Sequence, residues 1–144
     1  MESGGRILDR ILGISDRTNA ALHALALAEK NGGSIPAAAA AEQLGVSPTY
    51  LAKILQTLAR KNLITSSRGI GGGFSLKKPA AETTCLEVLE TLDGPLPRRA
   101  CLFKTPVCAA KKCSFSLLCA EIEERVTAEL ARITVGELAR SFTE

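Results

Sequence analysis

With 144 residues, 46% of them hydrophobic, and a net charge of +3, the chain is long enough for one packed domain plus an oligomerisation element. No apolar run approaches the roughly 18 residues of a membrane span, and the charged N-terminal stretch lacks the apolar core of a secretion signal. We therefore expect no membrane partner and a cytoplasmic protein whose five cysteines stay reduced.

The first predicted helix spans about residues 16–30, with Ser15 or Asp16 as N-cap and a Gly-Gly pair as its stop. A short alanine-rich helix follows, beginning at Pro36 and ending before Gly45. A third helix begins at the capping residue Ser47 and carries apolar residues at a period of 3.6. Its predicted core positions are Leu51, Ile54, Leu55 and Leu58.

Two short strands, at about residues 63–65 and 74–76, are predicted to flank a glycine-rich turn. Two helices joined by a tight turn and followed by a β-hairpin indicate a winged helix-turn-helix. In that motif the N-terminal residues of the second helix face the base edges of the DNA major groove. The residues at these positions, which we expect to contact DNA, are Ser47, Thr49, Tyr50 and Lys53.

The turn between the strands reads SSRGIGGGFSL. It lacks the GxGxxG and GK[ST] patterns of nucleotide-binding loops, and no helix follows that could bind a phosphate at its N-terminus. The alternatives are a flexible hairpin tip and a wing that contacts DNA, and we favour the wing. Gly71, Gly72 and Gly73 would let the backbone lie on the sugar-phosphate chain, and Arg68 would reach a narrow minor groove.

The distribution of charge favours the same class of partner. Residues 46–78 contain six basic residues and no acidic one, and residues 95–120 contain five basic residues and again no acidic one. Such blocks are typical of a nucleic-acid footprint, although a solvated face gives the same pattern.

The C-terminal half is predicted to contain a helix over about residues 84–92, a loop over 94–112 and a long amphipathic helix from residue 114. The apolar side of the long helix has no obvious cover in so small a chain, which predicts a symmetric homodimer. A dimer also suits a palindromic operator. The predicted dimerisation residues are Phe115, Leu118, Ile122, Val126, Leu130 and Ile133.

The expected fold is thus mainly α, a winged helix-turn-helix with a small β-hairpin wing and a long C-terminal dimerisation helix. We expect a DNA-binding domain over residues 12–82, a linker helix and cysteine-bearing sensor loop over 83–113, and a dimerisation helix with a C-terminal tail over 114–144.

Cys101, Cys108, Cys113 and Cys119 follow one another without a CxxC pair, which disfavours a zinc site. Nearby basic residues would stabilise thiolates and an anionic iron–sulfur cluster. Inert or redox-active thiols are the alternative. Cys85 is interpreted as a core residue, and Cys119 lies within the long helix, where packing is its ordinary role.

Together these segments resemble the Rrf2 family of bacterial winged-helix regulators, whose sensor members include IscR-, NsrR- and RirA-like proteins. The resemblance covers nearly the whole chain and includes VSPTYLAKILQTLARKNLITSSRGIGGGFSL, TTCLEVLETLDGP and ITVGELA. It implies a homodimeric DNA-binding transcription factor, a repressor or an activator. In sensor members of the family, three loop cysteines hold an iron–sulfur cluster that responds to iron, redox state or nitric oxide.

By resemblance, the cluster ligands would be Cys101, Cys108 and Cys113, with either a 2Fe-2S or a 4Fe-4S cluster. The histidine ligand that IscR-like members carry three residues after the last cysteine is replaced by Ser116. The first-helix aspartate of NsrR-like members is replaced by Asn19.

A further branch of the family uses a first-helix histidine across the dimer in an ALH context, which Ala21-Leu22-His23 matches. His23 of the partner subunit is thus the first choice for the fourth ligand, and Cys119 is the second. A glutamate that tunes sequence choice in IscR-like members is replaced by Ala52, so their operator preference does not carry over.

Two alternatives stay open: a cluster-free DNA-binding regulator that responds through thiols, a small molecule or a protein partner, and an electron-transfer or cluster-carrier protein. An enzyme is not expected, because one histidine and no acid near a candidate nucleophile give no acid–base constellation.

Overall fold

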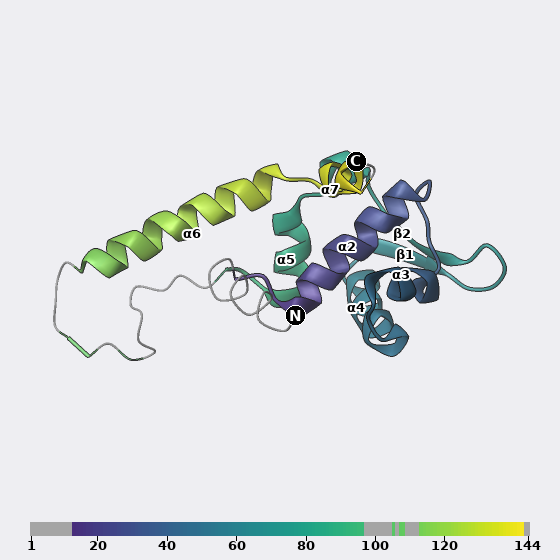
Figure 1. Ribbon diagram of the computed structural model, residues 1–144, viewed down its shortest axis with the longest axis horizontal. Helices are drawn as coiled ribbons and strands as arrows, with labels where there is room; N and C mark the ends of the chain where they lie inside the picture. The colour runs from purple at the N-terminus through teal and green to yellow at the C-terminus, as the bar shows by residue number, and fades with distance from the viewer. Residues whose placement is uncertain (1–12, 97–104, 106, 109–112, 143–144) are drawn as a thin grey trace.

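The computed structural model describes residues 13–96, 105, 107–108 and 113–142. The helices are α2 (Asp16–Lys30), α3 (Ala37–Leu44), α4 (Pro48–Arg60), the 3₁₀ turn η1 (Ala80–Glu82), α5 (Cys85–Asp93), α6 (Ser114–Arg132) and α7 (Val135–Ser141), and the strands are β1 (Ile64–Ser67) and β2 (Gly73–Leu76) (Figure 1). None of the described helices is both long enough and apolar enough to cross a membrane.

Side-chain caps fix where several helices begin. Ser15 Oγ accepts from the backbone N–H of Thr18 at the start of α2, at 3.1 Å. Thr84 Oγ1 accepts from Glu87 N at the start of α5, at 3.1 Å. Such caps satisfy backbone donors that the first turn of a helix leaves unpaired. The cap predicted at Ser47 is confirmed, since its hydroxyl accepts from the N–H of Tyr50.

The turn between α3 and α4 depends on Gly45. Its φ of +66° lies in the left-handed region that side chains disfavour, and the next residue, Val46, donates to Ala41 O at 3.0 Å. This short turn sets α3 and α4 as the predicted helix-turn-helix.

The hairpin pairs β1 and β2 antiparallel, from Ile64 opposite Leu76 to Ser67 opposite Gly73. Phe74 also exchanges backbone hydrogen bonds with Ile35, which attaches the hairpin to the segment before α3. Leu63, predicted to be in the strand, lies just before it, because its N–H bonds to Leu58 O and closes the end of α4. The mainly helical fold with a two-stranded wing is confirmed.

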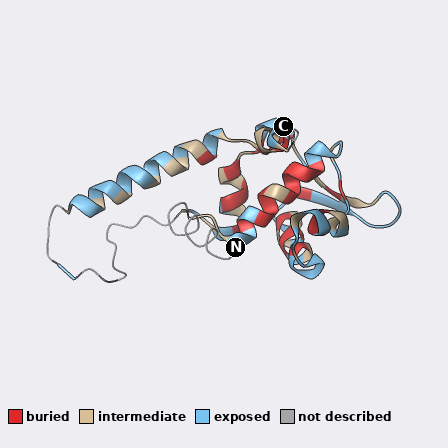
Figure 2. Cartoon of the chain, viewed as in Figure 1, coloured by how far each residue is buried: buried red, intermediate tan, exposed pale blue. Residues whose placement is uncertain are grey.

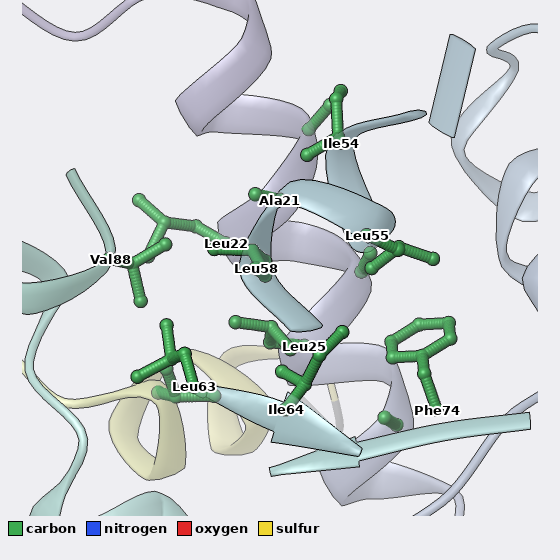
Figure 3. Packing of buried hydrophobic residues seen from close by; sticks show 14 of the residues in the cluster. Ala21, Leu22, Leu25, Ile54, Leu55, Leu58, Leu63, Ile64, Phe74 and Val88 are labelled. Carbon is green, nitrogen blue, oxygen red and sulfur yellow. The ribbon is translucent and has the colours of Figure 1, made fainter. Parts of the chain in front are cut away.

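The core lies where α2, α4 and the hairpin meet (Figure 3). Leu25 of α2, Leu51 and Leu58 of α4, Ile64 of β1 and Phe74 of β2 are all at most 2% exposed. Each such side chain contributes on the order of 2 kcal/mol of burial free energy. The four core positions predicted on α4 are confirmed as its buried residues.

The C-terminal segment expected as a tail forms α7, which packs against α2 and η1. A capping box between Thr134 and Glu137 begins this helix, and Val135 and Ala139 are buried. Backbone hydrogen bonds from Cys85 N to Ile133 O and from Val135 N to Thr83 O, both 2.8 Å, join the end of α6 to the start of α5.

Helix α6 extends away from the rest of the molecule (Figure 1), and most of its residues are exposed (Figure 2). Its C-terminal part is covered within the chain, since Leu130 is buried and Val126 and Ile133 pack against the core cluster. Its N-terminal part has no such cover within the described residues.

Candidate nucleic-acid interface and cysteine-bearing loop

The first turn of α4 presents polar side chains on one exposed surface. Ser47, Thr49, Tyr50 and Lys53 are all exposed, while the other face of the helix lies in the core. Partial burial and the carboxylate of Asp16 raise the pKa of Tyr50 above its ordinary value, so its hydroxyl is neutral and able to donate at neutral pH.

The wing lies beside α4 and forms one surface with it. A hollow of about 370 Å³ is lined by Ala52 and Gln56 of α4 and by Arg68, Gly69 and neighbouring wing residues. The small side chain of Ala52 leaves this hollow open. The structure therefore places Arg68 on the same surface as the predicted base-reading helix.

The glycines of the wing have different local roles. Gly71 has a φ of +76°, and a Cβ there would meet open space. A Cβ on Gly72 would lie 2.7 Å from Ser67 O, and one on Gly73 would lie 2.5 Å from Ile35 O. Packing within the chain thus accounts for Gly72 and Gly73, whereas Gly71 leaves the tip of the wing open to an approaching molecule.

The basic block is partly neutralised within the chain. Lys78 Nζ lies 2.6 Å from Glu87 Oε2, and Lys77 Nζ donates to Asn62 Oδ1 at 3.0 Å. Lys53 and Arg68 are exposed, and Arg68 lines the hollow between the wing and α4. Lys77 keeps its charge, because the amide of Asn62 is neutral, so Lys53, Arg68 and Lys77 all offer exposed positive charge to a polyanion.

A second hollow, of about 490 Å³, brings the candidate ligand positions on α2 close to α4. Its lining includes Asp16, Asn19 and His23 of α2 and Tyr50 of α4. The Nδ1 atom of His23 lies 2.8 Å from Asn19 O. When Nδ1 carries the proton and donates to this carbonyl, Nε2 keeps its lone pair and is able to bind a metal.

The cysteines fall into two kinds. Cys85 is buried, and burial raises the pKa of its thiol to about 11, which makes it a poor thiolate ligand and confirms it as a core residue. Cys108 is exposed, and Cys113 and Cys119 are partly exposed. Cys101 lies outside the described residues.

No three His, Cys, Asp or Glu side chains within the described ranges lie close enough together to hold a metal ion. The chemistry of the accessible donors, thiols with one imidazole, suits an iron–sulfur cluster. A cluster site would therefore need Cys101 or a second chain to complete it.

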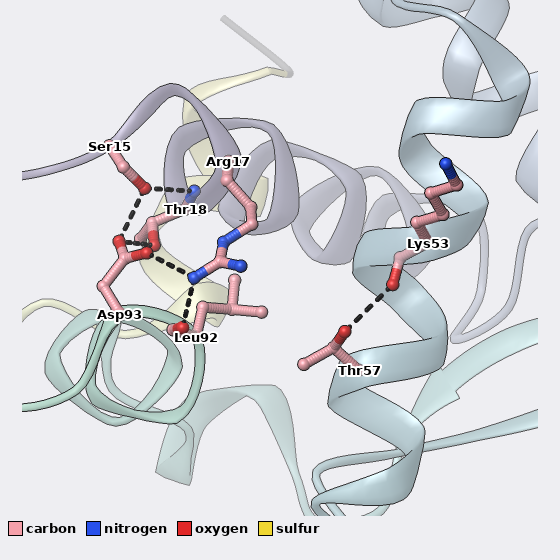
Figure 4. A network of polar contacts seen from close by, with 7 residues as sticks. All are labelled: Ser15, Arg17, Thr18, Lys53, Thr57, Leu92 and Asp93. Carbon is pink, nitrogen blue, oxygen red and sulfur yellow. Dashed lines mark hydrogen bonds and ion pairs between the residues drawn. The ribbon is translucent and has the colours of Figure 1, made fainter.

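A polar network that the sequence pattern did not predict joins α2 to the end of α5 (Figure 4). The carboxylate of Asp93 accepts from Ser15 Oγ at 2.6 Å, from Thr18 Oγ1 at 2.5 Å and from Arg17 Nη2 at 2.8 Å. Arg17 also donates to Leu92 O. Since Asp93 is followed directly by the segment that carries the cysteines, this network ties that segment to the start of α2.

The apolar stripe predicted on α6 divides into two parts. Phe115, Leu118 and Ile122 are 60%, 49% and 39% exposed, and Leu117 beside them is 63% exposed. The remaining three stripe residues are those that pack within the chain. The exposed part is thus confined to the N-terminal half of α6.

Known proteins resemble the chain in sequence and in fold. Residues 14–141 match the Rrf2 family, described as iron-dependent transcriptional regulators. The HTH-type transcriptional regulator IscR of Klebsiella pneumoniae strain 342 is 33% identical over 109 residues, which cover 76% of this chain and 67% of that protein. IscR of Escherichia coli O1:K1 is 32% identical over 109 residues, which again cover 76% of this chain and 67% of that protein.

Solved structures share the fold. Staphylococcus aureus CymR has a TM-score of 0.70 at 24% identity and covers 87% of this chain and 96% of its own. The structure of T. potens IscR has a TM-score of 0.67 at 17% identity and covers 90% of this chain and 87% of its own. The family match and the IscR relatives show that the chain belongs to the Rrf2 family of transcriptional regulators.

Proposed function

We propose that this regulator binds a palindromic DNA operator as a homodimer, and that an iron–sulfur cluster controls the binding. One observation carries the DNA-binding part: Arg68 of the wing lines a hollow together with Ala52 and Gln56 of α4, and Lys53, beside Ala52 on the same helix, is exposed. The sequence from 46 to 78, which supplies these residues, contains no acidic residue.

On this proposal the first turn of α4 enters the major groove, where Ser47, Thr49, Tyr50 and Lys53 contact bases and phosphates. The N-terminus of the helix adds a partial positive charge next to the phosphates. Arg68 reaches the minor groove, and the open glycine tip at Gly71 lets the wing backbone approach the sugar-phosphate chain.

The proposed cluster is held by Cys101, Cys108 and Cys113 of one subunit and by His23 of the partner subunit, with Cys119 as the second choice for the fourth ligand. The hydrogen bond between His23 Nδ1 and Asn19 O supports this assignment, since it leaves Nε2 for the metal. When bound, a 2Fe-2S or 4Fe-4S cluster supplies a charge that changes with redox state, iron supply or nitric oxide.

The hollow shared by His23 and Tyr50 supports a link between the cluster and DNA binding. A group bound at the imidazole would lie next to the helix turn that reads the operator. We also propose the division of labour expected from the sequence: DNA binding up to residue 82, sensing over 83–113, and dimerisation through the helix that follows.

The DNA-binding part is tested by comparing Arg68→Ala with Arg132→Ala, which removes one exposed positive charge at the C-terminal end of α6. Arg68→Ala is expected to weaken operator binding and to reduce the slope of log K against log salt by about one. Arg132→Ala should leave both unchanged. Unchanged binding by the Arg68 variant would contradict the proposed role of the wing and would favour an electron-transfer or cluster-carrier protein.

The cluster part is tested by anaerobic purification, visible absorption and iron analysis. Cys108→Ala is expected to lose colour and iron, whereas the matched variant Cys85→Ala, which removes a buried thiol, should keep both. A colourless wild-type protein that still binds its operator would exclude cluster control.

That last outcome would favour a second candidate, a cluster-free regulator that responds through a thiol, a small molecule or a protein partner. Cys108 is exposed and therefore open to oxidation. The fold is also similar to that of B. subtilis CymR, which is described as the global cysteine regulator of that organism. The TM-score is 0.70 at 24% identity, and the match covers 91% of this chain and 98% of CymR.

A further inference from the structure

A groove of about 690 Å³ lies between α5 and α6, and its lining shares no residue with the hollow between α4 and the wing. Leu86 and Leu96 supply apolar area to its lining, and Glu90, Glu123 and Glu124 supply acidic groups. The described lining contains no basic residue. The groove therefore suits a segment that is both apolar and basic.

The groove is distinct from the exposed apolar stripe of the same helix. At about 100° per residue, Ala120, Glu124 and Ala128 of the groove lie roughly opposite Phe115 and Ile122 around the helix axis. A second copy that covered the stripe would thus leave the groove on the other flank of α6.

The chain itself enters the described structure beside this groove. Gly13 has a φ of +67°, and a Cβ at this position would lie 2.9 Å from Leu96 Cδ2, so the backbone passes directly against a groove residue. The twelve residues that precede Gly13 span up to ~40 Å when extended. They are long enough to reach any part of the groove.

The sequence of these twelve residues complements the groove. Arg6 and Arg10 are four residues apart, and apolar residues stand between and after them. These apolar residues are Ile7, Leu8, Ile11 and Leu12. Asp9 stands between the arginines, so residues 6–12 carry a net charge of +1. Two arginines and four aliphatic side chains still match a groove lined by glutamates and leucines.

We propose that residues 6–12 dock in the α5–α6 groove of the same chain, with the arginines beside Glu90 and Glu124 and the aliphatic residues against Leu86 and Leu96. This docking does not depend on the proposed function. It would hold the N-terminal segment against Leu96 and the start of the cysteine-bearing segment.

The docked position is tested by placing a photo-crosslinking benzoylphenylalanine at Leu8 in the full chain. Mixed light and heavy isotope-labelled protein distinguishes crosslinks within a chain from crosslinks between chains. We expect crosslinks within a chain to residues 86–96 and 120–128. Crosslinks to another region, or to the groove of the partner subunit, would overturn the proposal.

The charge complementarity is tested by hydrogen exchange of the amides of residues 120–128. The Arg6→Glu/Arg10→Glu variant is expected to raise their exchange rate by about threefold or more, and adding Glu90→Lys/Glu124→Lys should restore protection. Glu121→Lys, which reverses a charge on α6 outside the groove lining, should not restore it. Unchanged exchange in the arginine variant, or equal rescue by Glu121→Lys, would overturn the proposal.

Discussion

At the scale of single residues, Asp93 at the end of α5 binds three side chains at the start of α2. Burial alone would raise the pKa of its carboxyl, but hydrogen bonds from Ser15, Thr18 and Arg17, with the charge of Arg17, hold the pKa below its ordinary value. A depressed pKa means that the ionised carboxylate is stabilised in the folded state. This stabilisation is present above the unfolded pKa of about 3.9 and is lost as the pH falls through the folded pKa.

We expect Asp93→Asn to lower the free energy of unfolding at pH 7 by about 1–3 kcal/mol, because Arg17 loses its ion pair and two hydroxyls lose a charged acceptor. Urea unfolding at pH 7 and at pH 3 measures the effect. The difference between wild type and variant should be smaller at pH 3, which lies below the unfolded pKa of about 3.9, because the stabilisation is lost as the pH falls towards the depressed folded pKa. A difference that is the same at both pH values would contradict the assigned role.

The sequence predicted the exposed residues of α4 and did not predict this network, for a physical reason. Helix periodicity and the Ser47 cap place Thr49, Tyr50 and Lys53 on the surface from local pattern alone. The partners of Asp93 stand 75 to 78 residues away in the chain, so no local pattern pairs them. Likewise, the hollow that holds both His23 and Tyr50 forms only when α2 packs on α4.

At the scale of elements, the wing depends on glycine for two separate reasons. Gly71 requires a left-handed backbone in open space, whereas Gly73 requires room against the carbonyl of Ile35. The second requirement belongs to the attachment of the hairpin, because Phe74 exchanges backbone hydrogen bonds with the same residue, Ile35. A side chain at position 73 would therefore push the wing away from the body of the domain.

We expect Gly73→Ala to lower the free energy of unfolding by about 1–3 kcal/mol, since its Cβ meets rigid backbone, and to weaken operator binding by moving the wing. Gly71→Ala is the matched variant, with backbone strain of about 1–2 kcal/mol and no clash. Thermal unfolding and the amide chemical shifts of Ile35 and Phe74 measure the effects. Unperturbed shifts in Gly73→Ala would contradict the close packing.

The predicted helices of the N-terminal half are confirmed. They could be predicted because caps, prolines and glycine stops mark their ends in the local sequence. Helix α7 was expected as a tail, although Thr134-Val-Gly-Glu137 is a capping-box sequence that would have indicated it. Its cover comes from α2, more than a hundred residues earlier in the chain, as the hydrogen bond from Lys30 Nζ to Phe142 O illustrates. Contacts of that range leave no local pattern in the sequence.

At the scale of the whole molecule, contacts among the described residues hold α6 at its C-terminal end. Leu130 is buried against the core, while the N-terminal half of the helix presents its large apolar side chains to solvent. Exposed leucine, isoleucine and phenylalanine at helical spacing favour packing against a second copy, as in a two-fold symmetric pair of helices. The three residues Phe115, Leu118 and Ile122 are therefore the part of the predicted dimerisation stripe on which we base the dimer.

We expect Leu118→Glu/Ile122→Glu to convert the dimer to a monomer, because charges placed in an apolar helix pair lose their hydration without gaining partners. Light scattering coupled to size-exclusion chromatography measures the mass. Ala131→Glu, an added charge at an exposed position off the stripe of the same helix, should remain dimeric. Operator binding by the double variant should also fall by at least tenfold, since one helix-turn-helix then reads one half-site without its linked partner. A double variant that stays dimeric, or a wild type that is monomeric at micromolar concentration, would contradict the role of this stripe.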